Sequence, residues 1–124
     1  MLTKSDVVAT IPAWDIERAK KFYIETLGFG PGEEDPGGVQ ISSGSTKFYL
    51  FPTMSGQPAG HTLASWEVDD IEIEVKELQN KGVKFEEYDM PGLKTENSIA
   101  SIGDFRGAWF KDSEGNILSL GQRA

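Results

Sequence analysis

The sequence predicts an α+β fold built from two tandem βαβββ units in one domain. An apolar segment is followed by an amphipathic helix pattern twice along the chain, the two copies share an Asp-Ile-Glu opening, and short strand patterns follow each helix. A length of 124 residues suits one ordinary domain. Within this 1–124 domain we expect unit one at about 5–53 and unit two at about 62–121.

Unit one is expected to open with a strand over Val7–Ile11, followed by a helix. Apolar residues recur at spacings of three and four over 16–27, which places them on one stripe of a helix. Asp15 is a good N-cap, and Gly28 can adopt the positive φ at which helices commonly end. This segment is therefore predicted to be a strand followed by an amphipathic helix.

A second copy of this pattern begins at Thr62. A strand-like run is followed by a helix pattern in which Asp69 or Asp70 can act as the N-cap and Gly82 ends the helix. Displacing the sequence by 55 positions lays the Asp-Ile-Glu opening at Asp15 on the one at Asp70. The match indicates an internal duplication.

Further strands are expected after each helix. In unit one, 38–43 and 46–51 flank a hairpin signal at Ser43-Gly44-Ser45. In unit two, strands are expected at 83–88, 99–102, 107–111 and 117–120. The stretches Pro31–Gly38 and Asp89–Ser98 are expected to be loops, which serve either as lids or binding loops or as plain surface excursions.

Composition excludes several classes of function. Twenty acidic and twelve basic residues give a net charge of −8, which disfavours nucleic acid as a partner. The absence of cysteine excludes disulfides, thiolate catalysis and thiolate metal sites. The first residues lack a signal-peptide pattern, and no apolar run approaches the roughly 20 residues that span a bilayer. We expect a cytoplasmic protein without a membrane partner.

Several segments together resemble the vicinal oxygen chelate superfamily, which includes glyoxalase I, bleomycin resistance proteins and extradiol dioxygenases. They are the helix that follows Asp15, the Val68-Asp-Asp-Ile helix start and the closing strand pair Trp109-Phe-Lys-Asp-Ser-Glu-Gly-Asn-Ile-Leu. The resemblance covers nearly the whole chain. It implies that the tandem units form a curved mixed sheet around a cup-shaped cavity, with helices on the outer face. It also implies a homodimer.

Enzymes of this superfamily generally use a divalent metal held by His, Gln or Glu on the first and last strands of the two units. The resemblance assigns these four positions to Val8, Leu50, Leu63 and Ser119. None of these residues is a good metal ligand. We therefore expect no metal and no other cofactor.

If the chain is catalytic at all, Glu67 and His61 are the candidate residues. Strand parity places Leu63, Ser65 and Glu67 on one face. Glu67 is then either a general base or charge partner inside the cup, or an exposed carboxylate at a strand end. A single imidazole makes no transition-metal site unless carboxylates converge beside it, and the alternative for His61 is an exposed histidine at a strand start.

The last hairpin is expected to place an aromatic side chain in the cup. A three-residue loop at Ser113-Glu114-Gly115 puts Trp109 opposite Ser119, whereas a four-residue loop puts Phe110 there. In both cases an aromatic ring faces the region where relatives hold a metal. Apolar walls with a few polar groups suit a small organic molecule.

The leading hypothesis is a metal-independent protein that binds a small aromatic or cationic organic molecule, similar to bleomycin resistance proteins that sequester a drug unaltered. The alternatives are a glyoxalase-like lyase or isomerase or a dioxygenase with a non-standard site, and an interaction module whose cavity has collapsed. The expected ligand-binding residues are Val8, Leu50, Leu63, Ser65, Glu67, Trp109 and Ser119.

Overall fold

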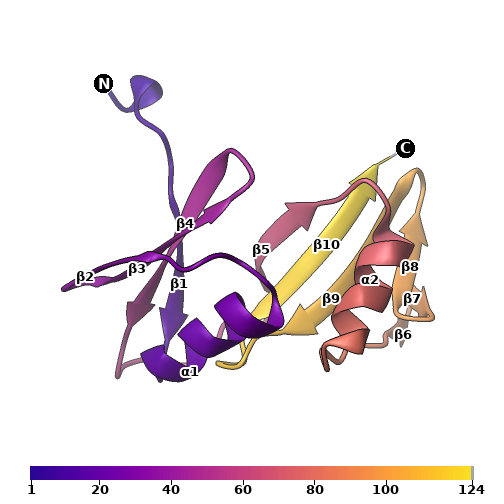
Figure 1. Ribbon diagram of the computed structural model, residues 1–124. Coiled ribbons are helices and arrows are strands. Elements are labelled where there is room, and N and C mark those ends of the chain that lie inside the picture. The colour runs from indigo at the N-terminus through magenta and orange to yellow at the C-terminus, as the bar shows by residue number, and fades with distance from the viewer. Residues whose placement is uncertain (124) are drawn as a thin grey trace. The chain divides into compact units, whose positions relative to one another are not determined.

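A computed structural model describes residues 1–123 and has the predicted α+β fold (Figure 1). The chain forms two compact units, Met1–Gly56 and a second that begins at Gln57. Each unit contains one curved, unclosed mixed sheet and one α-helix. No helix within residues 1–123 is long and apolar enough to cross a membrane.

The first unit is a four-stranded sheet in the order β1-β4-β3-β2. β1 runs parallel to β4, and the other pairs are antiparallel. β1 starts two residues later than expected and continues through Pro12, which an edge strand tolerates. The elements are η1 (Leu2–Lys4), β1 (Ala9–Ala13), α1 (Ile16–Lys21), η2 (Phe22–Thr26), β2 (Glu33–Asp35), β3 (Gly38–Ser43) and β4 (Thr46–Pro52).

Helix α1 begins after Asp15, whose Oδ1 accepts a hydrogen bond of 3.1 Å from the backbone nitrogen of Arg18, as predicted. The helical segment continues as the π-helical η2 and is followed by Gly28 at a φ of 88°. Tyr23 on η2 is fully buried, and its ring centroid lies 5.5 Å from that of Phe48. The core of the first unit therefore lies between this segment and one face of its sheet.

The second unit is a six-stranded sheet in the order β5-β10-β9-β8-β7-β6, with β5 parallel to β10. Asp70, and not Asp69, caps α2, because its Oδ1 accepts a hydrogen bond of 3.2 Å from the nitrogen of Ile73. Gln122 Oε1 accepts a second bond of 2.8 Å from the nitrogen of Ile71. The elements are β5 (Thr62–Glu67), α2 (Ile71–Asn80), β6 (Asp89–Met90), β7 (Leu93–Glu96), β8 (Ile99–Ile102), β9 (Phe105–Lys111) and β10 (Ile117–Arg123).

The prediction of a strand over 83–88 is wrong. This segment pairs with β9 only through one isolated bridge, between Phe85 and Phe110, and through a backbone hydrogen bond of 2.7 Å that the nitrogen of Glu86 donates to the carbonyl oxygen of Trp109. β8 pairs with Phe105 to Gly107, the first residues of β9. Only the remaining residues of that edge of β9 are therefore available to pair with 83–88.

Both predicted loops contain strands. Within 89–98, β6 and β7 form a hairpin that turns at Pro91-Gly92, with Gly92 at a φ of 80°. Within 31–38, β2 pairs with β3 and turns at Pro36-Gly37. Proline followed by glycine is a recognised turn signal, so these turns are consistent with the local sequence.

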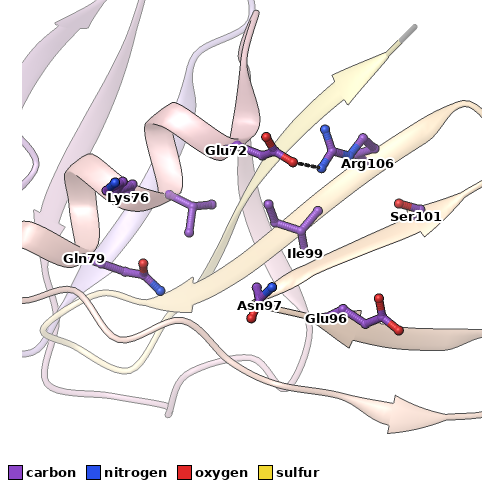
Figure 2. Close-up of a pocket in the computed structure, with 9 residues that line it drawn as sticks. Glu72, Lys76, Gln79, Glu96, Asn97, Ile99, Ser101 and Arg106 are labelled. Carbon is purple, nitrogen blue, oxygen red and sulfur yellow. Dashed lines mark hydrogen bonds and ion pairs between the residues drawn. The ribbon is translucent and has the colours of Figure 1, made fainter.

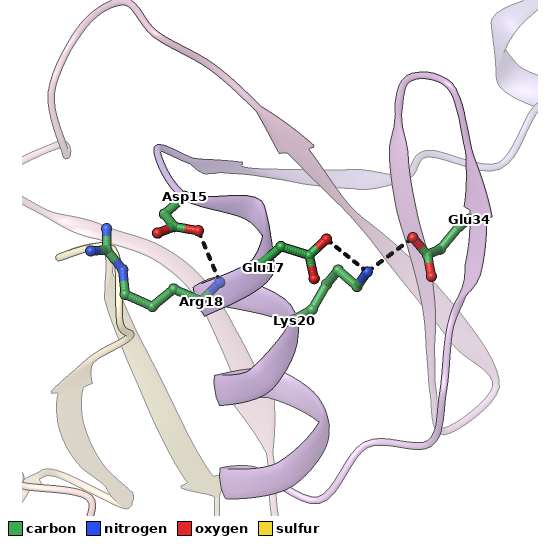
Figure 3. A network of polar contacts seen from close by, with 5 residues as sticks. All are labelled: Asp15, Glu17, Arg18, Lys20 and Glu34. Atoms are coloured by element: carbon green, nitrogen blue, oxygen red, sulfur yellow. Dashed lines mark hydrogen bonds and ion pairs between the residues drawn. The ribbon is translucent and has the colours of Figure 1, made fainter.

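Strand β2 is tied to α1 by one lysine (Figure 3). Lys20 Nζ lies 3.0 Å from Glu34 Oε1 on β2 and 3.3 Å from Glu17 Oε1 on its own helix. On the other side of β2, Asp35 Oδ1 accepts a 2.6 Å hydrogen bond from the hydroxyl of Tyr49. Side-chain contacts of Glu34 and of Asp35 therefore hold β2, and with it the β2–β3 hairpin, at two separate points.

Candidate functional site

The second sheet has one face toward α2 and one that points away from it. Gln122 hydrogen-bonds to the start of α2, so Leu118 and Leu120, at the same parity in β10, also point toward the helix. The residues between them point the other way, together with their partners across β5 and β9. We call this second side the helix-free face: Ser65, Glu67, Phe105, Gly107, Trp109, Ser119, Gly121 and Arg123.

The centre of the helix-free face is a pair of glycines under an aromatic ring. Gly107 and Gly121 lie directly opposite each other. A Cβ atom on Gly121 would stand 2.9 Å from Cε1 of Phe105, and one on Gly107 would stand 2.9 Å from Cε2 of the same ring. Any larger residue would displace this half-buried ring, because contacts under 3 Å are repulsive. The glycines therefore position Phe105.

A pocket of about 510 Å³ adjoins this ring. Arg123 covers Phe105, with its guanidinium carbon 5.3 Å from the ring centroid, a cation–π distance. Glu67 and Asp69 are exposed and supply negative charge to the pocket lining. The volume is in the range of small-molecule sites, which typically combine an aromatic surface with a few charged groups.

Trp109 occupies the position that the three-residue loop predicts. It lies opposite Ser119, while Phe110 is 1% exposed and belongs to the core. Asp112 fixes this register: its nitrogen donates a 2.9 Å bond to Asn116 O, and its Oδ1 accepts from the nitrogens of Glu114 and Asn116. The four-residue alternative is wrong for this hairpin.

The hydroxyl of Ser119 is bonded to its neighbour on the sheet. Ser119 Oγ donates a 2.7 Å hydrogen bond to Oγ of Ser65, its register partner on β5. Ser119 is 7% exposed, whereas Ser65 and Glu67 are exposed. Leu63 is half-buried and lies beside the irregularity in the pairing of β5 with β10.

Two other predicted ligand-binding residues lie in the first unit. Leu50 is fully buried at the same strand parity as Phe48, which packs on Tyr23, so it is a core residue of that unit. The expectation that Leu50 lines a ligand surface is corrected accordingly. Val8 is 37% exposed and precedes β1.

His61 and Glu67 are separated by the length of β5. His61 is exposed just before the strand, with Nδ1 3.2 Å from the carbonyl oxygen of Thr62, and Glu67 is the last residue of the strand. Because a strand advances about 3.3 Å per residue, the two lie about 20 Å apart along it. This spacing argues against an acid–base pair formed by these two residues in one chain.

Residues 1–123 contain no group of three or more His, Asp or Glu side chains that could hold a metal ion. The positions that the family resemblance assigns to metal ligands carry Val8, Leu50, Leu63 and Ser119. Aliphatic side chains have no donor atoms, and a serine hydroxyl alone is a poor ligand for a transition metal. The donor set does not fit the divalent metal of the related enzymes.

The sequence prediction missed Phe105, Gly121 and Arg123. The predicted strands began at Gly107 and ended at Leu120, so all three fell outside them. Phe105 and Arg123 are cross-strand partners in the last rung of the β9–β10 ladder. A signal was present, since Ile102 and Phe105 flank the turn residues Gly103 and Asp104, with Gly103 at a φ of 61°.

Solved structures share this fold over nearly their whole length. A glyoxalase family protein from Enterococcus faecalis aligns with a TM-score of 0.71 and 20% identity, covering 98% of this chain and 99% of the other. TnmS3, an antibiotic binding protein from Streptomyces sp. CB03234, aligns with a TM-score of 0.65 and 24% identity over 98% of each chain. A lactoylglutathione lyase from Agrobacterium tumefaciens aligns with a TM-score of 0.66 and 16% identity over 95% and 93%.

At these identities the structural likeness establishes the fold alone. A search of curated proteins finds no match. The family model for the Glyoxalase/Bleomycin resistance protein/Dioxygenase superfamily matches residues 6–120, nearly the whole sequence. The chain therefore belongs to the glyoxalase/bleomycin resistance protein/dioxygenase superfamily, as the resemblance of its helices and closing hairpin predicted.

Proposed function

We propose that this protein binds a small aromatic organic molecule and does not alter it chemically. The observation that carries the proposal is the Phe105 ring, which rests over Gly107 and Gly121 beside a pocket of about 510 Å³. Aromatic rings favour stacked or edge-on contacts with planar ligands, each worth about 0.5–1.5 kcal/mol beyond area burial. Trp109 adds a second aromatic surface on the same face.

Charge supports a ligand with a cationic group. Glu67 and Asp69 are exposed at this pocket, and the whole chain carries a net charge of −8. Arg123 also lines the pocket and keeps its positive charge over Phe105, so the lining carries two carboxylates against one guanidinium. A cationic molecule would be attracted to the protein at long range and would meet carboxylates beside the aromatic surface.

Metal independence is part of the proposal. It is supported by the donor-poor residues Val8, Leu50, Leu63 and Ser119 and by the bond that Ser119 already makes to Ser65. The proposed ligand-binding set consists of Ser65, Glu67, Trp109 and Ser119 from the sequence, together with Phe105, Gly121 and Arg123. The sequence expectations of a homodimer and a cytoplasmic location stay predictions, and light scattering of purified protein tests the first.

Calorimetric titration with a panel of planar cationic and planar neutral compounds tests the proposal. We expect saturable binding that favours the cations, that is unchanged after treatment with EDTA, and that releases the ligand at its original mass. A requirement for added divalent metal, or chemical conversion of the ligand, would refute it in favour of a lyase, isomerase or dioxygenase. Failure of every planar compound to bind would also refute it.

A further inference from the structure

The second unit has another pocket, of about 500 Å³, on the α2 side of its sheet (Figure 2). Glu72, Val75 and Gln79 form its helix wall at spacings of three and four. Asn97, Ile99 and Arg106 contribute to the sheet wall. None of these residues belongs to the helix-free face, so this groove is separate from the site proposed above.

An ion pair between Arg106 and Glu72 closes one end of the groove, and both side chains have further polar atoms that can bind a ligand. Nη2 of Arg106 lies 2.9 Å from Oε1 of Glu72, and the two side chains are 35% and 69% exposed. Within residues 1–123 the second oxygen of Glu72 and the other guanidinium nitrogens of Arg106 make no hydrogen bond or ion pair. A carboxylate accepts at two oxygens and a guanidinium donates five N–H bonds, so both groups can bind a further ion.

The middle and far end of the groove have different chemistry. Val75 and Ile99 provide apolar surface next to the ion pair. Beyond them, the amides of Gln79 and Asn97 extend toward each other from the helix and the sheet (Figure 2). Two further charged side chains, Lys76 on α2 and Glu96 beside Asn97, also line the groove. The groove therefore joins the ion pair to an aliphatic wall and then to the two amides.

The turn that carries Asn97 has a backbone conformation that residues other than glycine rarely adopt. Asn97 and Ser98 have φ values of 52° and 72°, as a two-residue hairpin turn between Glu96 and Ile99 requires. Glu87 secures this turn, since its oxygens accept bonds from the nitrogen and the hydroxyl of Ser98. Glycine would adopt these φ values without steric cost. Here the hydrogen bonds from Ser98 to Glu87 hold the backbone in that conformation instead.

We propose that this groove binds a free α-amino acid with an aliphatic side chain. The ammonium group binds the second oxygen of Glu72, the carboxylate binds the remaining N–H donors of Arg106, and the side chain lies along Val75 and Ile99. The two opposite charges of a zwitterion lie as close together as those of the ion pair, so each can face its opposite charge on the protein at the same time. Because the zwitterion has no net charge, it is not repelled by a chain of charge −8, as a simple carboxylate is.

An NMR titration of the ¹⁵N-labelled protein with leucine tests this proposal. We expect saturable shifts in backbone amides of the segment 97–101 and of α2, up to about 10 mM leucine. Leucinamide, which lacks the carboxylate, and 4-methylpentanoate, which lacks the ammonium group, are expected to bind at least about tenfold more weakly. Equal binding of either probe, or no saturable shift in this groove with leucine, overturns the proposal.

Three variants identify the anchor. Arg106→Gln is expected to weaken leucine binding at least about tenfold, and Arg106→Lys, which keeps the charge but loses the planar fork, by less. Glu77→Gln, on the same helix but outside the groove, is expected to bind leucine as the wild type does. Dispersed NMR spectra establish that each variant folds. Wild-type affinity in a folded Arg106→Gln protein contradicts the proposal.

Discussion

Arg123, near the end of the last strand, covers the ring of Phe105 at 5.3 Å from guanidinium carbon to ring centroid, and the two are cross-strand partners. The same ring rests over Gly107 and Gly121. The position of the ring is thus fixed by the two glycines below it and by the guanidinium over it. This arrangement makes Phe105 the residue on which the proposed aromatic contact depends most.

Phe105→Ala is expected to weaken binding of a planar ligand about tenfold or more, because it removes the aromatic contact and the cation–π partner of Arg123. Titration calorimetry with the tightest compound of the panel measures the effect. Ile73→Ala removes an apolar side chain that is 54% exposed on α2 and should leave the affinity unchanged. Equal losses in the two variants would show that the ring has no specific role.

Gly121→Ala is expected to displace the Phe105 ring, since the added Cβ would stand 2.9 Å from its Cε1 atom. The cost in unfolding free energy should be about 1–3 kcal/mol, as for overpacking elsewhere. Urea unfolding measures it, and near-UV circular dichroism reports the aromatic environment. Gly60→Ala is the matched control, because a Cβ there meets nothing within 4 Å. Identical stabilities of the two variants would contradict the inference that the glycines position the Phe105 ring.

The sequence predicted the fold and the parity of β5 and β10 because apolar periodicity and helix caps are local signals. It missed β7, and it missed β2 and β6 although both turn at Pro-Gly, at Pro36 and Pro91, which are separated by the same 55 positions as the two helix openings. The duplication therefore extends through these turns. β2 is three residues long and β6 only two. Strands this short are established by pairing with a neighbouring strand, which is tertiary information that the local sequence does not carry.

The candidate site was predicted in part for the same reason. The family resemblance pointed to Ser119, and a three-residue loop in the last hairpin placed Trp109 opposite it, a loop that Asp112 enforces locally. Phe105 and Arg123 were missed because they extend the ladder beyond its apolar centre by pairing with each other. The two side chains meet only when β9 and β10 are paired, so the local sequence around either residue does not predict the contact.

Glu87→Gln is expected to lower stability at neutral pH and to have little effect in acid. The hydroxyl of Thr95, and then Ser98, donate hydrogen bonds that hold the pKa of Glu87 below its ordinary value. A lowered folded-state pKa means that the contribution is complete above the unfolded-state pKa of about 4.3 and is lost as the pH falls through the folded-state value.

Thermal melting of wild type and Glu87→Gln between about pH 3 and pH 7 measures this dependence. The difference in Tm should be largest at neutral pH and should close at the acid end. Glu77→Gln, which changes an exposed helix carboxylate in the same way, provides the control. A difference in Tm that is constant across the whole range would mean that ionisation of Glu87 does not hold the turn.

Lys20→Met is expected to loosen β2 while leaving the rest of the first unit folded. Lys20 Nζ contacts Glu34 on β2 and Glu17 on α1, and its side chain is only 18% exposed, so methionine keeps the packing and removes both ion pairs (Figure 3). Amide hydrogen exchange in 33–35 should accelerate about two- to fivefold, a size typical of partly exposed pairs. Lys21→Met, at an exposed neighbouring position, should leave that exchange unchanged. Because Asp35 still accepts the hydrogen bond from Tyr49, the strand should remain paired with β3, and complete loss of its protection would mean that Lys20 alone holds the hairpin.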